Sequence, residues 1–286
     1  QLLDCGNGEK LEKFGPYMLI RPEPKALWAK TEAGEQWTER AHIRFLQGAG
    51  FGRAGKEDSG TWEKLKKVPD QWVIQYKKLF RLRLGLTAFK HVGVFPEQAP
   101  NWDYIYHSVK KIREKEPGNV PRVLNLFAYT GAASLAARAA GAEVVHLDAV
   151  RQVITWSREN MELSGMNGIR WILEDAFRFV RREVRRGNTY QGLILDPPAY
   201  GHGPEGEKWK LDDCLYSLLQ ECAHILAPEN AFVVLNLYSN GYSALLADSL
   251  ARECFPAGGD YSFGELYLKD SYGKRLPLSV FSRIEL

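Results

Sequence analysis

The fold of this chain is decided by the stretch Val123-Leu124-Asn125-Leu126-Phe127-Ala128-Tyr129-Thr130-Gly131, which an alanine-rich run follows at 132–142. Apolar, partly β-branched residues enter a polar turn and then residues of high helix propensity, a pattern that predicts strand, turn and helix. A helix N-terminus at the carboxyl end of a parallel strand forms the crevice in which open α/β sheets bind ligands. The stretch therefore predicts a nucleotide-like site in an α/β domain.

After residue 121 short apolar runs alternate with longer helical ones, which predicts a parallel sheet covered on both faces. Strands are expected at 123–127, 143–147, 169–173, 191–195, 231–237, 265–269 and 278–285. Helices are expected from the first turn to Gly141, at 151–163, from Asp175 to Gly187, at 212–226 and at 242–253. Only a turn separates the last two strands, so this pair must be antiparallel and the sheet is mixed.

The part before this sheet has a different pattern, and we expect a small β-rich domain at 1–103 followed by the α/β domain at 104–286. A glycine-rich loop is expected at 48–60 and one long strand at 72–86, with a helix at 104–114 after an irregular connector. Basic residues in the long strand fit either the solvent face of a sheet or contact with nucleic acid.

The composition is that of a globular protein, with 45% apolar and 26% charged residues in 286. No apolar run is long enough to predict a membrane span. The four cysteines form no Cys-x-x-Cys pair, which favours reduced thiols in a cytoplasmic protein over a disulfide or zinc scaffold, and no metal site is predicted. The sequence starts at Gln1 without Met, so we expect an upstream segment.

The charge is unevenly distributed along the chain. Residues 1–115 carry 21 Lys and Arg against 14 Asp and Glu, a surplus of 7, whereas residues 116–286 carry 17 against 21, a deficit of 4, which gives the net charge of +3. A basic first part fits a polyanionic partner such as RNA, although the bias is modest.

Polar residues stand at the carboxyl ends of four successive strands, namely Asn125, Asp148, Asp175 and Asp196. Strand ends of a doubly wound sheet converge on one crevice, so we expect these side chains to meet there. Each of them alone also fits the cap of a helix. Asp148 lies about twenty residues beyond the first turn, where an acid can accept hydrogen bonds from ribose hydroxyls, which indicates a cofactor that contains a nucleoside.

Motifs that the sequence lacks further restrict which nucleoside cofactor can bind. The first turn has no G-x-G-x-x-G and no P-loop lysine, so the phosphate cradles of dinucleotides and triphosphates are absent and a nicotinamide-dependent oxidoreductase is disfavoured. A nucleoside cofactor without phosphate fits better, and S-adenosylmethionine has that composition.

The motifs together resemble those of a known enzyme family. The stretch at 123–131, with His146-Leu147-Asp148-Ala149, Arg158-Glu159-Asn160 and Leu195-Asp196-Pro197-Pro198-Ala199-Tyr200, is similar to bacterial class I S-adenosylmethionine-dependent methyltransferases related to the enzymes that modify large-subunit ribosomal RNA bases. The resemblance covers about residues 90–286. It implies a doubly wound, Rossmann-like sheet of seven mostly parallel strands.

The resemblance also implies which residues hold the cofactor. It maps the methionine part to the first turn, the ribose to the acid after the second strand and the adenine to the acid after the third, with a connector residue folding over them. The implied set is Gln98, Asn125, Phe127, Tyr129, Gly131, Asp148, Ala149, Asp175, Ala176, Phe177 and Asp196.

Methyl transfer is expected at the motif that begins with Asp196. Two prolines fix the backbone there, so that the carboxylate presents acceptors to a planar amine or amide edge on which an aromatic ring can stack. Transfer mostly requires alignment of the nucleophile with the methyl group, and a base in folded RNA would have to be extruded into the pocket. The predicted catalytic residues are Asp196, Pro197, Pro198 and Tyr200.

One departure from the relatives bears on the reaction. Enzymes that methylate carbon 5 of cytosine need a cysteine nucleophile, which in these relatives follows the fifth strand, whereas this chain has Leu237-Tyr238-Ser239-Asn240. Cys214 and Cys222 fit small core residues of a helix better. We therefore predict transfer to nitrogen or oxygen of a base, in ribosomal RNA. A protein or small-molecule acceptor, or a noncatalytic RNA-binding protein that retains the fold, remain alternatives.

Overall fold

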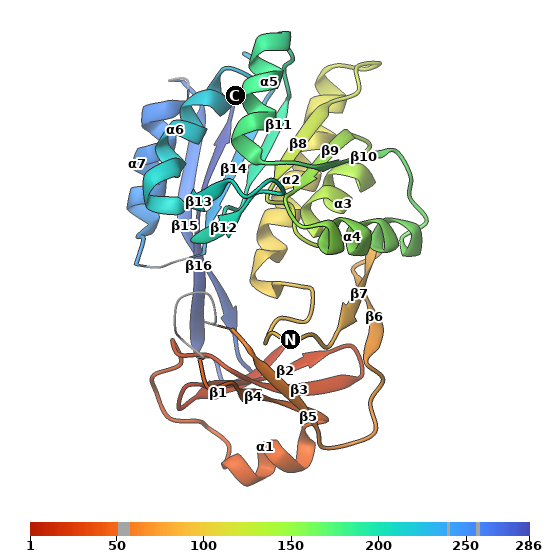
Figure 1. Cartoon of the computed structure of the whole chain (residues 1–286), viewed down its shortest axis with the longest axis vertical. Coiled ribbons are helices and arrows are strands. Elements are labelled where there is room, and N and C mark those ends of the chain that lie inside the picture. Colours follow the sequence, from red (N-terminus) through yellow and green to blue (C-terminus); the bar gives the residue numbers. More distant parts are fainter. Residues whose placement is uncertain (51–57, 239–240, 256–257) are drawn as a thin grey trace. The chain divides into compact units, whose positions relative to one another are not determined.

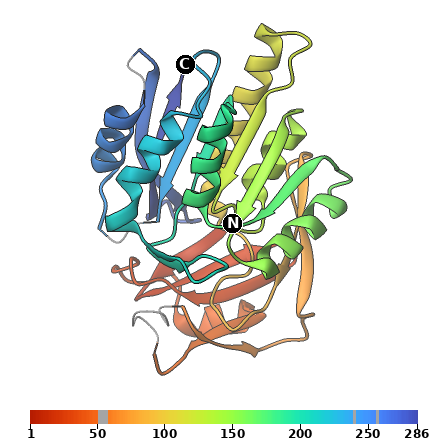
Figure 2. The ribbon, with the colours of Figure 1, turned by 45° about the horizontal axis from the view of Figure 1, so that its top comes forward.

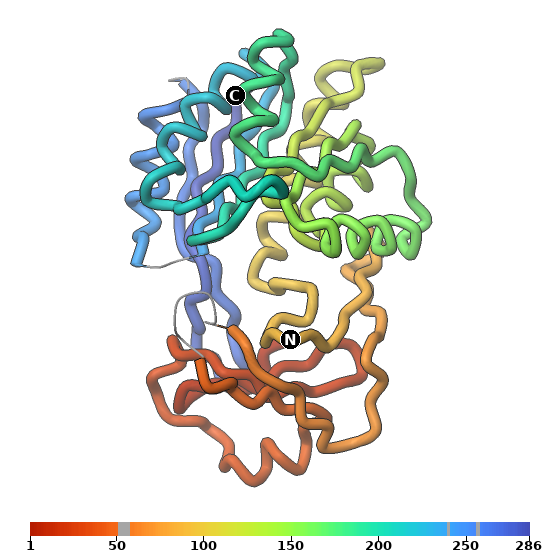
Figure 3. The backbone as a smooth tube through the Cα atoms, in the orientation of Figure 1, coloured from red at the N-terminus to blue at the C-terminus, as the bar shows by residue number. Residues whose placement is uncertain are grey.

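The computed structural model describes residues 1–50, 58–238, 241–255 and 258–286. The chain groups into two compact units. Figure 3 traces the backbone in colours that run from red at the N-terminus to blue at the C-terminus. Unit 1 contains Gln1–Glu97 and Tyr267–Leu278, and unit 2 contains Gln98–Leu266 and Ser279–Leu286. The sequence placed a single boundary after residue 103, whereas the observed grouping assigns the turn region of the C-terminal strand pair to unit 1.

Unit 1 is built on a five-stranded sheet in the order β1-β2-β3-β4-β5. Its strands are β1 (Leu2–Gly6), β2 (Glu9–Phe14), β3 (Tyr17–Pro22), β4 (Ile43–Gln47) and β5 (Gly60–Lys64). Neighbouring strands are antiparallel except β3 and β4, which are parallel and are connected through α1 (Gly34–Arg40). Trp37 of α1 is fully buried against Leu11 and Ile20, so the crossover helix covers one face of the sheet.

A two-stranded hairpin follows in unit 1, where the sequence analysis expected one strand at 72–86. The prediction was wrong at the middle, because β6 (Gln71–Tyr76) and β7 (Phe80–Gly85) pair with each other in antiparallel register. Lys77 at the turn has a φ of 48°, a left-handed conformation that reverses the chain. Alternation of period two continues on both sides of such a turn, so the pattern by itself did not reveal the break.

Unit 2 contains most of a seven-stranded sheet in the order β10-β9-β8-β11-β14-β16-β15 (Figure 1). The strands are β8 (Arg122–Leu126), β9 (Glu143–Asp148), β10 (Ile169–Leu173), β11 (Gly192–Leu195), β14 (Phe232–Leu237), β15 (Asp260–Lys269) and β16 (Arg275–Glu285). All pairings from β10 to β14 are parallel, and β16 is antiparallel to β14. The predicted doubly wound, mostly parallel sheet of seven strands is confirmed.

The helices are α2 (Ala99–Lys115), α3 (Ala132–Ala139), α4 (Arg151–Leu163), α5 (Ala176–Arg186), α6 (Leu211–Ala223) and α7 (Ala244–Cys254). The strand order runs in opposite directions from β8, so right-handed crossovers place α3 and α4 on one face of the sheet and α5, α6 and α7 on the other (Figure 2). Helix α2 starts five residues before the predicted 104, with Pro100 in its first turn, where a missing N–H costs nothing.

Alternation along the strands assigns each side chain to one of these faces. Leu124, Leu126 and Leu147 belong to the large apolar core that includes residues of α5, α6 and α7. Asn125 and His146, one position along, face the other way and bond to residues of α3 and α4. The sequence also missed a short hairpin between β11 and α6, formed by β12 (Tyr200–His202) and β13 (Lys208–Lys210), where it expected only a glycine-bearing loop.

Candidate active site

The turn after β8 has an unusual backbone. Phe127 and Tyr129 have φ angles of 56° and 48°, and Gly131, the N-cap of α3, has a φ of 91°. Left-handed conformations are uncommon outside glycine, and such residues cluster at ligand sites. The Asp148 carboxylate accepts hydrogen bonds from the Tyr129 N–H at 3.0 Å and the Val150 N–H at 2.9 Å, so the end of β9 fixes this turn.

Helix α4 holds the same turn from a second direction. The Ser157 hydroxyl donates to the Tyr129 carbonyl at 2.6 Å, and the Asn160 amide donates to the Thr130 carbonyl at 2.8 Å. Asn160 belongs to a motif that the sequence shows without indicating its role, and Ser157 was not predicted. Their spacing of three puts both side chains on one face of α4, which is a signal that a search for buried polar pairs would find.

A buried polar chain joins β8 and β9 to these helices. The Asn125 amide donates to the Ser134 hydroxyl at 2.9 Å, and the His146 ring lies 3.0 Å from Ser134 Oγ and 3.3 Å from Ser157 Oγ. Burial lowers the pKa of His146 to about 3, so the ring is neutral. The predicted meeting of Asn125 with the three strand-end acids is not observed among its hydrogen bonds, because it precedes the strand end and points toward α3.

Asp196 lies at the centre of a hydrogen-bonded group that links distant parts of unit 2. Its carboxyl group accepts from the Gln98 amide at 3.2 Å and from the Asn236 amide at 2.7 Å. Gln98 in turn accepts from Asn101 at 2.8 Å, and Asn236 accepts from the Ser279 hydroxyl at 3.1 Å. Gln98 and Asp196 were predicted from the sequence, whereas Asn236 was not, although it is the one amide inside the otherwise apolar β14.

Desolvation sets the protonation of both strand-end acids. It raises the pKa of Asp196 to about 6, although the bond from Asn236 opposes this effect. It also raises the pKa of Asp148, against the bonds from the N–H groups of Val150, Tyr129 and Ala149. Shifted carboxyl groups of this kind are enriched at functional sites.

Asp175 behaves as the helix-cap alternative predicts. Its side chain accepts a hydrogen bond from the Arg178 N–H at 2.9 Å at the start of α5. Ala176 follows and is buried, and Phe177 is half-buried. A surface groove of about 480 Å³ includes Asp175 and Phe177 and continues along α5 past Arg181.

An aromatic group connects the first turn with the motif after β11. The Trp209 ring lies 4.8 Å from the Phe127 ring and 6.3 Å from the Phe177 ring, measured between centroids. Its indole N–H donates to the Pro198 carbonyl at 2.6 Å. Pro197 is buried, whereas Tyr200 is 59% exposed. Trp209 was not anticipated, because its partners are distant in sequence.

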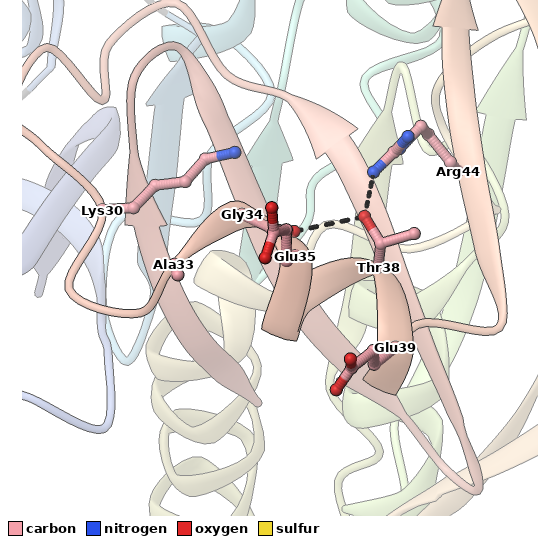
Figure 4. A pocket seen from close by; sticks show the side chains of 7 residues that line it. All are labelled: Lys30, Ala33, Gly34, Glu35, Thr38, Glu39 and Arg44. Atoms are coloured by element: carbon pink, nitrogen blue, oxygen red, sulfur yellow. Dashed lines mark hydrogen bonds between the residues drawn. The ribbon is translucent and has the colours of Figure 1, made fainter.

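Unit 1 has a surface pocket of its own, of about 840 Å³, between Lys30 and Arg44 (Figure 4). Arg44 donates to the Thr38 hydroxyl at 2.6 Å, and Lys30 pairs with Glu9. The pocket is also lined by Glu35 and Glu39, so its two cations and two carboxylates balance and do not select a ligand by charge.

A comparison with protein families shows the family of this chain. Residues 17–255 match a family described as S-adenosylmethionine-dependent methyltransferase. The chain belongs to this family. Since the match covers most of the chain and includes the first turn, Asp148 and the motif at Asp196, the protein is a methyltransferase and S-adenosylmethionine is its cofactor.

Solved and curated proteins agree with this assignment. A methyltransferase of this type from Agrobacterium tumefaciens is 40% identical, with a TM-score of 0.90 over 100% of this chain and 89% of that one. A methyltransferase complexed with S-adenosylhomocysteine has the same fold, with a TM-score of 0.70 and 16% identity over 97% of this chain and 71% of that one.

The ribosomal RNA large subunit methyltransferase K/L of Shewanella frigidimarina is 28% identical over 162 residues, which are 54% of this chain. This match spans 21% of the curated relative's length. The methyltransferase is therefore related to ribosomal RNA methyltransferases over about half of its own sequence.

Two further findings concern membrane spans and metal sites. Among the helices that the structure describes, none is long and apolar enough to cross a membrane. Within the same described residues there is no group of three or more His, Cys, Asp and Glu side chains that could hold a metal ion.

Proposed function

We propose that this methyltransferase transfers a methyl group from S-adenosylmethionine to a nitrogen or oxygen atom of an RNA base, with ribosomal RNA as the acceptor. The proposal rests on the position and environment of Asp196. A half-buried carboxyl group with a pKa near 6 begins a motif with two prolines and an exposed tyrosine, and two amides from distant elements orient it.

The residues around the first turn fit the cofactor. The left-handed backbone at Phe127, Tyr129 and Gly131 opens the turn toward a ligand, and Asp148 has a desolvated carboxyl group suited to ribose hydroxyls. We assign the methionine part to the turn, the ribose to Asp148 and the adenine to the start of α5. The full proposed set is Gln98, Asn125, Phe127, Tyr129, Gly131, Asp148, Ala149, Asp175, Ala176, Phe177 and Asp196, in which Asn125 acts through Ser134.

The bound cofactor supplies an electrophilic methyl group, and the chain's own residues align the acceptor. An exocyclic amino group of a base would donate a hydrogen bond to the Asp196 carboxylate, which directs the nitrogen lone pair away from the carboxylate. Pro197 and Pro198 hold the backbone of the motif rigid, and Tyr200 stacks on the base. The carboxylate is placed to take the proton that the nitrogen loses once it has gained the methyl group.

The cysteines support a nitrogen or oxygen acceptor over carbon 5 of cytosine. Cys222 is fully buried in α6, where desolvation raises the pKa of its thiol far above the usual range, and desolvation raises the pKa of Cys254 to about 11. Neither forms a thiolate nucleophile readily. Ser239 and Asn240, where the related enzymes carry the cysteine, lie outside the described residues, but neither is a cysteine.

Unit 1 has a part in this proposal as well. Residues 1–103 carry 17 Lys and Arg against 13 Asp and Glu, and we propose that this small β-rich domain contacts the RNA. The remaining residues, 104–286, are proposed to form the domain that binds the cofactor and transfers the methyl group.

Nucleoside mass spectrometry tests the acceptor. Ribosomal RNA from a strain that lacks the gene is incubated with purified protein and S-adenosylmethionine, and its nucleosides are compared with those of untreated RNA. We expect one new N- or O-methylated base, and Asp196→Ala should abolish it. Formation of 5-methylcytosine would contradict the proposed atom, and methylation of protein in a ribosome extract without RNA methylation would favour the alternative acceptor.

A further inference from the structure

The hairpin formed by β12 and β13 has two unlike faces. Its register pairs Tyr200 with Lys210, Gly201 with Trp209 and His202 with Lys208. Directly paired residues of an antiparallel ladder share a face, and successive residues alternate. One face therefore carries Gly201 and Trp209, and the other, here called the hairpin face, carries Tyr200, His202, Lys208 and Lys210.

The first of these faces anchors the hairpin. Trp209 is 6% exposed, and its ring packs near Phe127 of the first turn and Phe177 of α5. Its indole N–H holds the Pro198 carbonyl. The hairpin is thus fixed both to the first turn and to the motif at Asp196.

The turn of the hairpin is held separately. Arg178 of α5 forms exposed ion pairs with Glu205 and Glu207, which join the turn of the hairpin to α5. The lysines of the hairpin face do not have such partners among the described contacts, apart from an exposed pair between Lys210 and Asp213 at 3.1 Å, which contributes little.

All four residues of the hairpin face are exposed to solvent. An exposed aromatic ring beside two lysines combines the two elements with which proteins bind single-stranded nucleic acid, namely a ring for base stacking and cations for phosphates. A base within a duplex could not reach such a ring, because it is stacked on its neighbours.

We propose that the hairpin face binds the single-stranded RNA segment that carries the target base, with a base stacked on Tyr200 and adjacent phosphates at Lys208 and Lys210. The proposal rests on the proposed RNA acceptor and adds where the RNA lies and in which form. Because Tyr200 follows the motif at Asp196 directly in the chain, RNA bound on this face would adjoin that motif, on the side of the hairpin opposite to the one that packs on the first turn.

Fluorescence anisotropy tests this surface. A labelled 12-nucleotide single-stranded RNA of mixed sequence, and a hairpin duplex of equal length, are titrated with the full-length protein in the presence of S-adenosylhomocysteine at several salt concentrations. The variant K208A/K210A removes the two cations. K111A/K115A removes two exposed lysines near the C-terminal end of α2, which leads to the N-terminal end of the central strand β8, and serves as the control.

We expect K208A/K210A to weaken binding and to reduce the slope of log K against log salt by about 1.4, since each phosphate contact on a single strand contributes about 0.7. Tyr200→Ala should weaken single-strand binding roughly 5- to 150-fold, the usual range for one stacked base. K111A/K115A should retain both the wild-type affinity and the wild-type slope. Calorimetry with S-adenosylmethionine checks that each variant is folded.

Two outcomes would overturn the inference. Wild-type affinity and slope in K208A/K210A would remove the lysines from the interface, and tighter binding of the duplex than of the single strand would exclude a single-strand platform. Failure of the proposed function is recognised separately, because the wild-type protein would then neither bind nor methylate RNA. Methylation of RNA by a wild-type protein whose hairpin variants bind normally would refute the hairpin face alone.

Discussion

At Asp196, desolvation and hydrogen bonding act in opposite directions on one carboxyl group. Desolvation dominates and places its pKa at about 6, within reach of ordinary assay conditions. Only the ionised form accepts a hydrogen bond from an amino group through either oxygen. Protonation at this residue should therefore govern the reaction.

We predict that kcat/KM for RNA methylation is constant above about pH 6 and falls roughly tenfold for each pH unit below that value. Asp196→Asn, which cannot ionise, should lower kcat and remove this limb of the profile. Steady-state rates between pH 5 and 8 check this. A wild-type profile that is flat over this range would contradict it.

Asp148 combines two roles at one residue, since it fixes the first turn and presents a carboxyl group to the proposed ribose. We expect Asp148→Ala to weaken S-adenosylmethionine binding at least tenfold, because the hydrogen bonds from Tyr129 and Val150 are lost together with the ligand contact. Isothermal calorimetry measures the affinity, with the exposed Asp260→Ala as control. Equal affinities of both variants would argue against this site.

At the scale of elements, the junction between β8 and α3 depends on Gly131. Its φ of 91° disfavours any side chain, and an added Cβ would come within 3.3 Å of Ser157 Cβ and 3.4 Å of His146 Cε1. Gly187, at the C-terminal end of α5, has a φ of 64° but open space around it. A substitution at Gly187 therefore tests backbone strain alone, whereas one at Gly131 adds crowding by neighbouring side chains.

We predict that Gly187→Ala lowers the free energy of unfolding by roughly 1–2 kcal/mol and leaves cofactor binding unchanged, since only the backbone conformation is strained. Gly131→Ala should cost more and should also weaken S-adenosylmethionine binding, because Ser157 and the turn must move. Urea unfolding and calorimetry measure both. Wild-type cofactor affinity in Gly131→Ala would show that the turn tolerates this displacement.

The buried chain of Asn125, Ser134, His146 and Ser157 joins two strands to two helices, and it makes the stability of this layer depend on pH. The pKa of His146 is about 3 in the folded protein and its ordinary value is 6.5, so below pH 6.5 the unfolded chain binds a proton that the folded chain does not. The sign is therefore a loss of stability as the pH falls from 6.5 toward 3.

Between pH 7.5 and pH 5 this residue should contribute about 2 kcal/mol to the loss of unfolding free energy. We expect His146→Gln, whatever its absolute stability, to lose that part of the pH dependence, as measured by urea unfolding at both pH values. Identical pH dependence in the two proteins would show that His146 becomes protonated in the folded state.

At the scale of the whole molecule, an ion pair inside unit 1 joins the two ends of the chain. The Asp4 carboxylate is fully buried and accepts hydrogen bonds from the Thr31 and Glu32 N–H groups, the Trp37 indole and the Lys274 ammonium, the last at 2.7 Å. Leu276 and Leu278 pack with Leu2 and Cys5 in the same region. Unit 1 is therefore closed by a segment some 270 residues away in sequence.

Lys274→Met should lower the free energy of unfolding by roughly 1–3 kcal/mol, because it leaves one bond of a buried carboxylate unmade. Lys269→Met removes an exposed lysine from the same strand pair and should change stability by no more than about 0.5 kcal/mol. Urea midpoints of both variants decide this. Equal midpoints would mean that Asp4 is satisfied without Lys274.

Much of unit 2 follows from sequence alone because its signals are local. Strand and helix periods, the cap at Asp175 and the glycine after α5 each depend on a few neighbouring residues, and α4 and β10 were predicted with their observed bounds. The parallel order and the family motifs then place Asp148 and Asp196 at strand ends, and the doubly wound sheet is confirmed. The strand-turn-helix at 123–131 and the identity of the cofactor were accessible in this way.

The tertiary structure alone decided which side chains meet across the sheet. Asn236 reaches Asp196, Ser157 reaches Tyr129 and Trp209 reaches Pro198, and none of these pairs is marked by a local pattern. The turn at Lys77 and the assignment of Tyr267–Leu278 to unit 1 were missed for the same reason. Periodicity reports which way a side chain faces, whereas the identity of its partner depends on packing between elements far apart in sequence.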